Sequence, residues 1–383
     1  SVDSSAEVSL LNDLIDVRSG TAVDSYAEVA ALASIATRLM GEAAGVASSP
    51  VLTPSDFTAL GVSGVTRENL AEVLAAIRAS ADDGSQIDTL TELRTLVDAA
   101  VALSRQNAID TISRYDGTSA TTTPALADFA NAGVTGVTNG NLVSINSAFA
   151  VIGIANSDAT EEIQGLVSGY VTILLGADGQ RDSDVSLSSS DYVAMNLARV
   201  DTSGKADLLN QIFDGLLIAK VDTYSELQSA SDVVADIFLT ATGAQPQSEL
   251  TVARLEAIGL SGTTSGNIAL LVAAIADTSD DTLGVDSFAE VQAIVNQVRA
   301  SQAGALGVIS AYDGTNTVPS VNTLQSAGIT GVDSSNIGII NQYLATMSAE
   351  LTDSVAEVQA LVNALSKLLI CADGTANENC TFT

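Results

Sequence analysis

Apolar residues recur along this chain at the spacing of an α-helix, and they hardly ever alternate as in a strand. In one stretch they fall at Val29, Leu32, Ile35 and Leu39, which makes one side of a helix apolar. The pattern predicts long helices of about 20 to 25 residues, separated by polar loops and shorter apolar segments. Because the Val/Thr alternation typical of strands is nearly absent, the expected fold class is all-α.

A recurring polar phrase marks where each long helix is expected to begin. A Ser or Thr is followed three residues later by Glu, the spacing of a capping box, in which hydroxyl and carboxylate each accept a backbone N–H. At Ala159 the hydroxyl is missing, so we expect Ser157 or Asp158 to cap that helix. The complete pairs are Ser25 with Glu28, Thr89 with Glu92, Thr223 with Glu226, Ser287 with Glu290, and Ser354 with Glu357.

These phrases belong to an internal repeat. Residues 1–188 return as residues 199–383, with three residues lost in loops, and the offset of 198 spans three helix-start phrases. A fixed period indicates a stacked array. We therefore predict a tandem array of about 65-residue three-helix units, in two copies of a 198-residue three-unit block.

The predicted boundaries follow the helix-start phrases. Partial units at both ends lead us to expect that the segment belongs to a longer chain. The predicted pieces are 1–22 as the end of a preceding unit, complete units at 23–86, 87–156, 157–220, 221–284 and 285–351, and 352–383 as the start of a further unit.

Glycines mark two corners in a unit. Asp-Gly pairs such as Asp116-Gly117 follow the first helix, where Gly is expected to supply the left-handed cap that ends it. A second corner reads Gly-x-Ser/Thr-Gly, but Asn196 and Arg199 replace its two glycines in the unit 157–220. Asn is the non-glycine residue that best tolerates left-handed backbone. We therefore predict that only the first glycine of this corner is conformationally required.

A pair of polar residues precedes the last helix of a unit. Each pair resembles a capping box with Asn in place of Glu, which predicts a helix start. A ladder of ligand-binding amides is the functional alternative, and a cap with a stacking contact is the interpretation we favour. The pairs are Thr66 with Asn69, Thr138 with Asn141, Thr264 with Asn267, and Asp333 with Asn336.

The net charge limits the binding partners and the surrounding medium that we expect for this protein. With 46 acidic and 14 basic residues, the net charge is −32. Such a surface disfavours nucleic-acid binding and charge-driven adhesion to anionic membranes, and it suits a salty or calcium-bearing medium that screens the repulsion. No apolar run of about 18 residues exists, so no transmembrane segment is expected.

The two cysteines suggest a location. Cys371 and Cys380 stand at the two feet of one Asp-Gly loop, and the earlier copy of that loop has no cysteine. The simplest interpretation is a disulfide that closes the loop. Because such bonds persist outside the cytosol, we expect an extracellular or cell-surface protein. A two-cysteine metal site is the alternative, but further Cys or His ligands are lacking.

One Asp-Gly loop is a candidate metal site. Asp178, Asp182 and Asp184 offer three carboxylates within seven residues, oxygen ligands of the kind that calcium accepts. The spacing departs from an EF-hand, since Leu187 and Val193 occupy the positions of its glycine and glutamate. A solvated turn at a helix end is the favoured alternative. A calorimetric titration with millimolar calcium tests the hypothesis. No cofactor is otherwise expected.

Catalysis is not expected of this sequence. The chain has no histidine, which eliminates His-dependent triads and most zinc sites. Neither a Gly-x-Ser-x-Gly elbow nor a phosphate-binding Gly-rich loop with Lys is present. Glu161 and Glu162 form a carboxylate pair, but they stand at a helix start, where the helix dipole explains them. An enzyme is therefore the third and least favoured possibility.

The repeat phrases are similar to those of a known class of proteins. The segment Tyr312–Thr317, the corner Gly328–Val332 and the helix start Val285–Ala293 resemble tandem helical repeats in giant secreted surface proteins of Gram-negative, often aquatic, bacteria. The resemblance implies an adhesin, an extracellular filament or a surface-layer component. Many proteins of this class are exported without a cleaved signal.

Two functions are therefore expected. The first is a non-enzymatic structural element, a stalk, filament or surface layer built by repeat stacking, self-association and contacts with neighbouring repeats of a longer chain. The alternative is an adhesion module whose Asp-Gly loops bind calcium or a cell-surface glycan. The copies differ most in these loops, between Thr118–Thr123 and Thr315–Val318 for example, which suits a spacer better than a shared ligand site.

Overall fold

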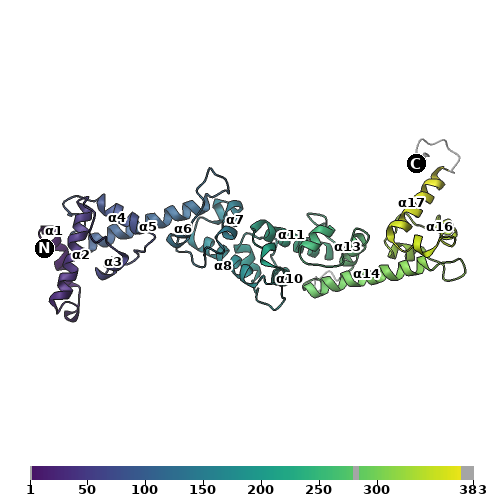
Figure 1. The fold of residues 1–383 in the computed structure, drawn as a ribbon, viewed down its shortest axis with the longest axis horizontal. Helices are drawn as coiled ribbons and strands as arrows, with labels where there is room; N and C mark the ends of the chain where they lie inside the picture. The colour runs from purple at the N-terminus through teal and green to yellow at the C-terminus, as the bar shows by residue number, and fades with distance from the viewer. Residues whose placement is uncertain (1, 279–283, 372–383) are drawn as a thin grey trace. The chain divides into compact units, whose positions relative to one another are not determined.

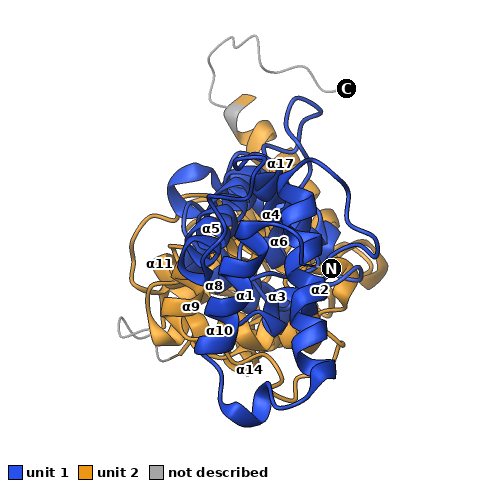
Figure 2. Ribbon diagram, turned by 90° about the vertical axis from the view of Figure 1, so that its left-hand side faces the viewer, with its two compact units in different colours: residues 1–171 blue, residues 172–383 orange. Residues whose placement is uncertain are grey.

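The computed structural model describes residues 2–278 and 284–371, and within these ranges it contains helices but no strand (Figure 1). The all-α prediction is confirmed. The chain divides into two compact units, residues 1–171 and 172–383 (Figure 2). Their border falls inside α8 (Thr160–Gly176), so it coincides with none of the predicted repeat boundaries, which stay predictions. None of the described helices combines the length and apolarity that crossing a membrane requires.

The first unit alternates long, very short and intermediate helices. Long helices carry the capping boxes, and the very short ones follow a loop. After α1 (Ser5–Asp16), its helices are α2 (Tyr26–Ala43), α3 (Pro54–Ala59), α4 (Leu70–Arg78), α5 (Leu90–Ser113), α6 (Leu126–Asn131) and α7 (Leu142–Ile152), before α8 crosses the border.

The second unit continues the same alternation. Short 3-10 turns precede several of the long helices in both units, as at Ile218–Lys220. The α-helices of this unit are α9 (Ser189–Ala194), α10 (Ser203–Asp214), α11 (Tyr224–Ala241), α12 (Val252–Ala257), α13 (Ile268–Ala276), α14 (Phe288–Ser310), α15 (Val321–Ser326), α16 (Ile337–Leu344) and α17 (Val355–Cys371).

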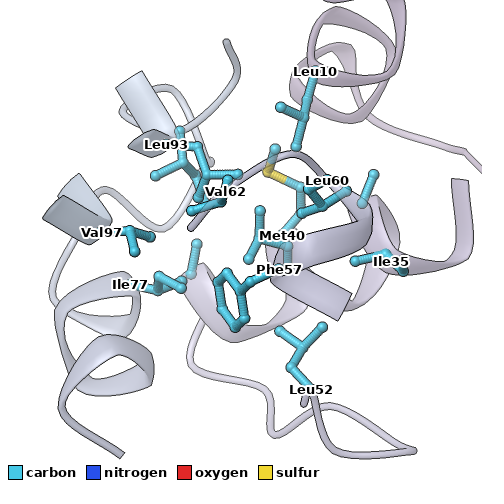
Figure 3. Packing of buried hydrophobic residues seen from close by; sticks show 14 of the residues in the cluster. Leu10, Ile35, Met40, Leu52, Phe57, Leu60, Val62, Ile77, Leu93 and Val97 are labelled. Atoms are coloured by element: carbon cyan, nitrogen blue, oxygen red, sulfur yellow. The ribbon is translucent and has the colours of Figure 1, made fainter. Parts of the chain in front are cut away.

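The core of the first unit is made by side chains from five successive helices (Figure 3). Leu10 of α1, Met40 of α2, Phe57 of α3, Ile77 of α4 and Val97 of α5 all lie in this cluster, and each is buried. The six-residue α3 is too short to be stable alone. Burial of Phe57, worth about 1.5 to 3 kcal/mol, holds it in place.

A second buried cluster, near the end of the described chain, is formed by helices of the same kinds. Ile309 of α14, Leu324 of α15 and Ile340 of α16 pack with Val358 and Val362 of α17, and all five are buried. In both clusters a long helix, a short helix and an intermediate helix share their core with the next long helix. The long helices α5 and α14 thus contact the helix that precedes them as well as the helix that follows them.

The capping boxes form as the sequence predicts. For α14, the Ser287 hydroxyl accepts the Glu290 N–H at 3.3 Å, and the Glu290 carboxylate accepts the Ser287 N–H at 3.1 Å. Reciprocal bonds of this kind start α2, α5 and α17, and at α11 the Glu226 carboxylate accepts the Thr223 N–H at 3.0 Å. At α8 the carboxylate of Glu162 accepts the N–H groups of both Asp158 and Ala159, so here glutamate provides the cap.

The Asp-Gly pairs within the described residues do not end the long helices, contrary to the sequence prediction. Helix α5 ends at Ser113, and its C-cap Arg114 is right-handed, whereas Gly117 lies three residues further on with φ 75°. The Asp116 carboxylate accepts the N–H of Thr118 at 2.9 Å, and this tight turn requires the left-handed glycine between them. The glycine therefore shapes the loop and not the helix end.

The Thr/Asn pairs also differ from the prediction in their place. Helix α4 begins at Leu70, so Asn69 is the N-cap residue and Thr66 lies outside the helix. The two residues still exchange bonds, because Asn69 Oδ1 accepts the Thr66 N–H at 2.8 Å and Thr66 Oγ1 accepts the Asn69 N–H at 3.3 Å. The pair closes the turn that leads into the helix.

Candidate functional site

The Gly-x-Ser/Thr-Gly segments form the most regular feature of the described chain. We call them corner segments, and they are residues 61–64, 133–136, 259–262 and 328–331, with 196–199 as the variant form. Both glycines of each regular corner segment have positive φ, for example 81° at Gly133 and 93° at Gly136. The prediction that only the first glycine is required is therefore wrong for these segments.

The second glycine is needed for backbone conformation and for close packing. A Cβ added to Gly262 would lie 2.6 Å from Cδ of Arg299, which belongs to the following long helix α14. At Gly64 and Gly331 an added Cβ would make only ordinary contacts, 3.6 Å from Val101 and 4.0 Å from Val362, so there the left-handed backbone alone favours glycine. The variant corner segment keeps only the first left-handed residue, Asn196 with φ 60°, as predicted.

A glutamine of the following long helix binds the corner segment through both ends of its amide. Gln164 of α8 accepts the Thr135 N–H at 2.8 Å, and its Nε2 donates to the Thr135 carbonyl at 3.2 Å. The same two bonds join two further pairs, Gln292 with Ser261 and Gln359 with Thr330. A side-chain amide thus satisfies a turn's backbone as a neighbouring strand would. We call this attachment the corner clamp.

Two corner segments are held by other side chains at the same junction. Arg94 of α5 donates to the Gly61 carbonyl from Nε at 3.1 Å and from Nη2 at 2.9 Å. Tyr224 at the start of α11 donates its hydroxyl to the carbonyl of Met195, just before the variant segment, at 2.7 Å. Arg199 of that segment binds Asp232 of α11 at 2.8 Å. All five described corner segments are therefore attached to the next long helix, although the residue that does so changes.

The asparagines predicted as caps or ligands are used inside the corner. Asn69 Nδ2 donates to the Gly64 carbonyl at 2.9 Å, and Asn141 Nδ2 donates to the Gly136 carbonyl at the same distance. Because Oδ1 already accepts the Thr N–H, both ends of each amide are occupied. This geometry supports the structural role and leaves no ladder of open amides at these positions.

An ion pair between the long and short helices is inverted between the two copies. Arg38 of α2 binds Asp56 of α3 at 2.7 Å, whereas Asp236 of α11 binds Arg254 of α12 at 2.7 Å. Positions 38 and 236, and positions 56 and 254, are equivalent at the offset of 198. Exchange of both charges preserves the attraction, so the contact itself is common to the copies.

The inverted pair in the second unit belongs to a larger buried network. Asp236 is fully buried and accepts bonds from Arg199 at 2.6 Å, from Arg254, and from the N–H of Gln247 at 3.0 Å. Arg199 also binds Asp232 at 2.8 Å. Burial alone raises the pKa of Asp236, but the bonds from Arg199 and Arg254 hold it below its ordinary value. The variant corner is thus tied to α11 by charge.

The predicted calcium ligands do not form a cluster. Within the described residues, no three acidic or cysteine side chains stand close enough to hold a metal ion. Asp178 instead accepts the N–H of Gln180 at 2.8 Å. Desolvation, and then the charges of Asp184 and Asp178, raise the pKa of Asp182. The calcium hypothesis gains no geometric support, and it stays a prediction.

The residue that organises this loop is one that the sequence did not point to. Asp214, at the end of α10, is buried and its carboxylate accepts three successive N–H groups, from Ser183 at 2.8 Å, Asp184 at 3.0 Å and Val185 at 3.2 Å. One turn earlier, Asn210 accepts the Leu187 N–H and donates to the Leu187 carbonyl. The loop is therefore held by α10 and not by an ion.

Arg181 of the same loop packs against other parts of the second unit. Its guanidinium lies 3.5 Å from the centre of the Phe288 ring, a cation–π contact at the start of α14. The contact needs a glycine beneath it, because a Cβ at Gly215 would lie 2.4 Å from Cζ of Arg181. Desolvation lowers the pKa of Arg181.

In two other Asp-Gly loops, the aspartate carboxylate accepts hydrogen bonds from residues of the same loop. Asp116 Oδ1 accepts the Thr121 hydroxyl at 2.6 Å and the Thr118 hydroxyl at 2.7 Å, and these bonds lower the pKa of Asp116 to about 2. Asp313 accepts the N–H and hydroxyl of Thr315 in a similar turn. Of the predicted disulfide, Cys380 lies outside the described residues, so the bond to Cys371 stays a prediction.

A groove of about 490 Å³ lies beside the buried network, between α11 and α12. Charged side chains of both signs line it, among them Lys220, Glu226, Asp232 and Arg254. Asp232 and Arg254 are already engaged in ion pairs, and Glu226 caps α11. Three of these four charged groups therefore take part in contacts that stabilise the fold.

No protein-family model, curated protein or solved structure matches this chain. The resemblance to bacterial surface repeats stays a prediction, and the function is argued from the contacts alone.

The sequence held signals for several of these residues. The clamp glutamines all stand two residues after the capping glutamate, as in Glu290 and Gln292, so their spacing was visible. A comparison of charges at the offset of 198 would have found the inverted pair. No comparable signal marked Asp214, since a single Asp at a helix end is common.

The corner clamp predicts a measurable effect for Gln292→Ala. Loss of both bonds to Ser261 should lower the free energy of unfolding by about 1 kcal/mol and speed hydrogen exchange at the Ser261 amide. Gln228→Ala is the matched control, because Gln228 holds the same position on α11 and is exposed. Equal effects of the two substitutions would contradict a stabilising role for the clamp.

Proposed function

We propose that this chain is a non-enzymatic structural repeat protein, a segment of an extracellular stalk, filament or surface layer. Its element is a three-helix unit of a long, a short and an intermediate helix, joined to the next unit at a corner segment. The predicted unit boundaries 23–86, 87–156, 157–220, 221–284 and 285–351 place each of the corner clamps between neighbouring units.

The observation that carries this proposal is that a side chain of the next long helix holds every described corner segment, in three cases through the corner clamp. All five described corner segments bind the following long helix, through Gln164, Gln292 and Gln359 or through Arg94 and Tyr224. A contact repeated at every junction is what an array needs to transmit load and set spacing. A catalytic site, in contrast, is normally formed once.

Retention of the ion pair with inverted charges supports the same proposal. Arg38 with Asp56 and Asp236 with Arg254 occupy equivalent places but differ in both residues. The chemistry at these positions has changed while the helix–helix contact has been kept. This is expected where the selected property is geometry, whereas a shared ligand site would keep the charges.

The proposal places the protein outside the cell, by two arguments. A disulfide between Cys371 and Cys380 would persist only in an oxidising compartment. A net charge of −32 is best tolerated in a medium whose salt screens repulsion between neighbouring chains. The adhesion alternative has less support, because Asp116 and Asp313 use their carboxylates within their own loops.

Imaging of the assembled material tests the proposal. The purified chain, in a buffer with physiological salt and millimolar calcium, is examined by cryo-electron microscopy and analytical ultracentrifugation. Regular end-to-end or lateral assemblies are expected for a filament or a lattice. Isolated monomers without lateral contacts would rule out those two forms and leave the stalk, and specific capture of glycans would favour adhesion instead.

A further inference from the structure

The two copies of one helix pair differ in how far they are covered. Helix α1 packs against α2, and the equivalent α10 packs against α11. Tyr224, the first residue of α11, is 2% exposed, whereas its equivalent Tyr26 in α2 is 90% exposed. The same sequence position is therefore a buried contact in one copy and an open aromatic surface in the other.

In the second copy, residues 177–198 cover this pair. We call this segment the repeat end; it consists of a loop, the short helix α9 and the variant corner. Its loop donates three N–H groups to Asp214, and Leu187 exchanges two bonds with Asn210. Tyr192 of α9 donates to Asn210 at 2.6 Å, and the Met195 carbonyl accepts from Tyr224.

Helix α1 carries the same receiving groups without a cover. Asn12 and Asp16 stand at the positions of Asn210 and Asp214, and both are exposed. Val8, one turn before Asn12, is 47% exposed, whereas its equivalent Ala206 is 2% exposed. Residues 8, 12 and 16 lie on one side of a helix, so the polar groups and the apolar side chain form a single face.

We propose that Val8, Asn12, Asp16 and Tyr26 form a docking surface for a repeat end of the 177–198 kind, supplied by a neighbouring repeat. The partner is defined by the groups that it must supply. Three successive backbone N–H groups donate to Asp16, and one peptide group exchanges two hydrogen bonds with Asn12. A backbone carbonyl next to a corner segment accepts the hydroxyl of Tyr26. This inference rests on the proposed function, since it specifies one of the array's contacts.

The surface also selects which repeat end it accepts. Val17 takes the place of Gly215, and it is 61% exposed. A Cβ at Gly215 would lie 2.4 Å from Arg181 Cζ, so a side chain at Val17 leaves no room for an arginine lying across it. A repeat end with a small residue at the place of Arg181 therefore fits this surface better than one that keeps the arginine in that position.

A fusion supplies the partner at high effective concentration. Residues 157–198 are joined directly before Ser1 of the full chain, which reproduces the spacing of the second copy because residue 199 is equivalent to residue 1. The added segment carries Arg181→Ala. Hydrogen exchange of the amides in α1 and in the first turns of α2 should slow by about tenfold or more relative to the full chain alone.

Four comparisons make the result specific. Asn12→Ala with Asp16→Ala should abolish the added protection, and so should Tyr26→Ala, whereas Ala31→Ser should leave it unchanged because position 31 and its equivalent Ser229 are both exposed. Keeping Arg181 in the added segment should weaken the protection. Protection that survives the double substitution, or an equal effect of Ala31→Ser, would overturn the proposal.

A further variant separates this proposal from the proposed function. Asn210→Ala in the unmodified chain should speed exchange at Leu187. If it does and the fusion gives no protection, the docking surface is wrong while the structural function stands. If Asn210→Ala changes nothing, the contact from which the docking surface is argued does not hold and this proposal is overturned, whereas the proposed function rests on the corner segments and is tested by Gln292→Ala. Dimerisation of the unmodified chain that Tyr26→Ala abolishes would assign the surface to a second copy instead and would also overturn the proposal.

Discussion

Replacement of Asp236 by alanine is expected to destabilise the second unit by about 3 kcal/mol. The substitution leaves the side chains of Arg199 and Arg254 beside each other without their shared anion, and it frees the buried N–H of Gln247. Urea unfolding followed by circular dichroism measures the loss. Arg38→Ala in the first unit, which removes a single ion pair, should cost about 1 kcal/mol.

A charge exchange provides the sharper test of the same network. Asp236→Arg, Arg254→Asp and Arg199→Ser together reproduce the residues of the first copy, namely Arg38, Asp56 and Ser1. We expect the triple variant to recover most of the stability lost in Asp236→Ala. If Arg254→Asp alone were as stable as the triple variant, the pair would contribute nothing to the packing of α11 on α12.

The pH dependence of this network follows from the sign of the pKa shift. Because the pKa of Asp236 is lowered from 3.8, the carboxylate stabilises the fold above that pH, and the stabilisation is lost as the pH falls through the folded value. The stability difference between wild type and Asp236→Asn should therefore be constant above about pH 5 and shrink below pH 3.8. A difference that grew on acidification would contradict the assignment.

Asp214→Ala is expected to release the loop before α9 and to cost about 2 to 3 kcal/mol. Three backbone N–H groups would lose their acceptor at once, and Val185 is among the buried residues. Hydrogen exchange at residues 183–185 should accelerate strongly, while α14 keeps its protection at Val295 and Val298. Millimolar calcium should not restore the loop if Asp214 is the organising group.

Asp16→Ala is the matched control for this variant. It removes the equivalent carboxylate at the end of α1, which is exposed in the chain alone, so its effect on stability should be within about 0.5 kcal/mol. A loss as large as that of Asp214→Ala would mean that the residue acts through its own helix and not through the loop.

The sequence was most informative where structure is local. Capping boxes such as Ser287 with Glu290 depend on residues three apart, and in all five predicted pairs the glutamate carboxylate accepts the N–H of the Ser or Thr. It was less accurate where two local roles compete for one residue. The sequence predicts Gly117 at a helix end, but the Asp116 carboxylate accepts the Thr118 N–H, and Gly117 lies in the loop turn that this bond closes. Thr66 was assigned to a cap, yet α4 begins at Leu70.

By itself, the sequence determined the helical fold class, the helix starts and the internal period, because these follow from short-range spacing. Tertiary structure decided what joins the elements. Gln164 reaches a corner segment 29 residues away, Asp214 binds a loop that precedes α9 in the chain, and Gly262 lies under Arg299 of the helix that packs on its corner segment. Such contacts depend on which surfaces meet in space, and the spacing of residues in the chain does not encode this directly. Tyr26 and Tyr224 occupy equivalent positions in the two copies, but only Tyr224 is buried, because the segment 177–198 packs over it.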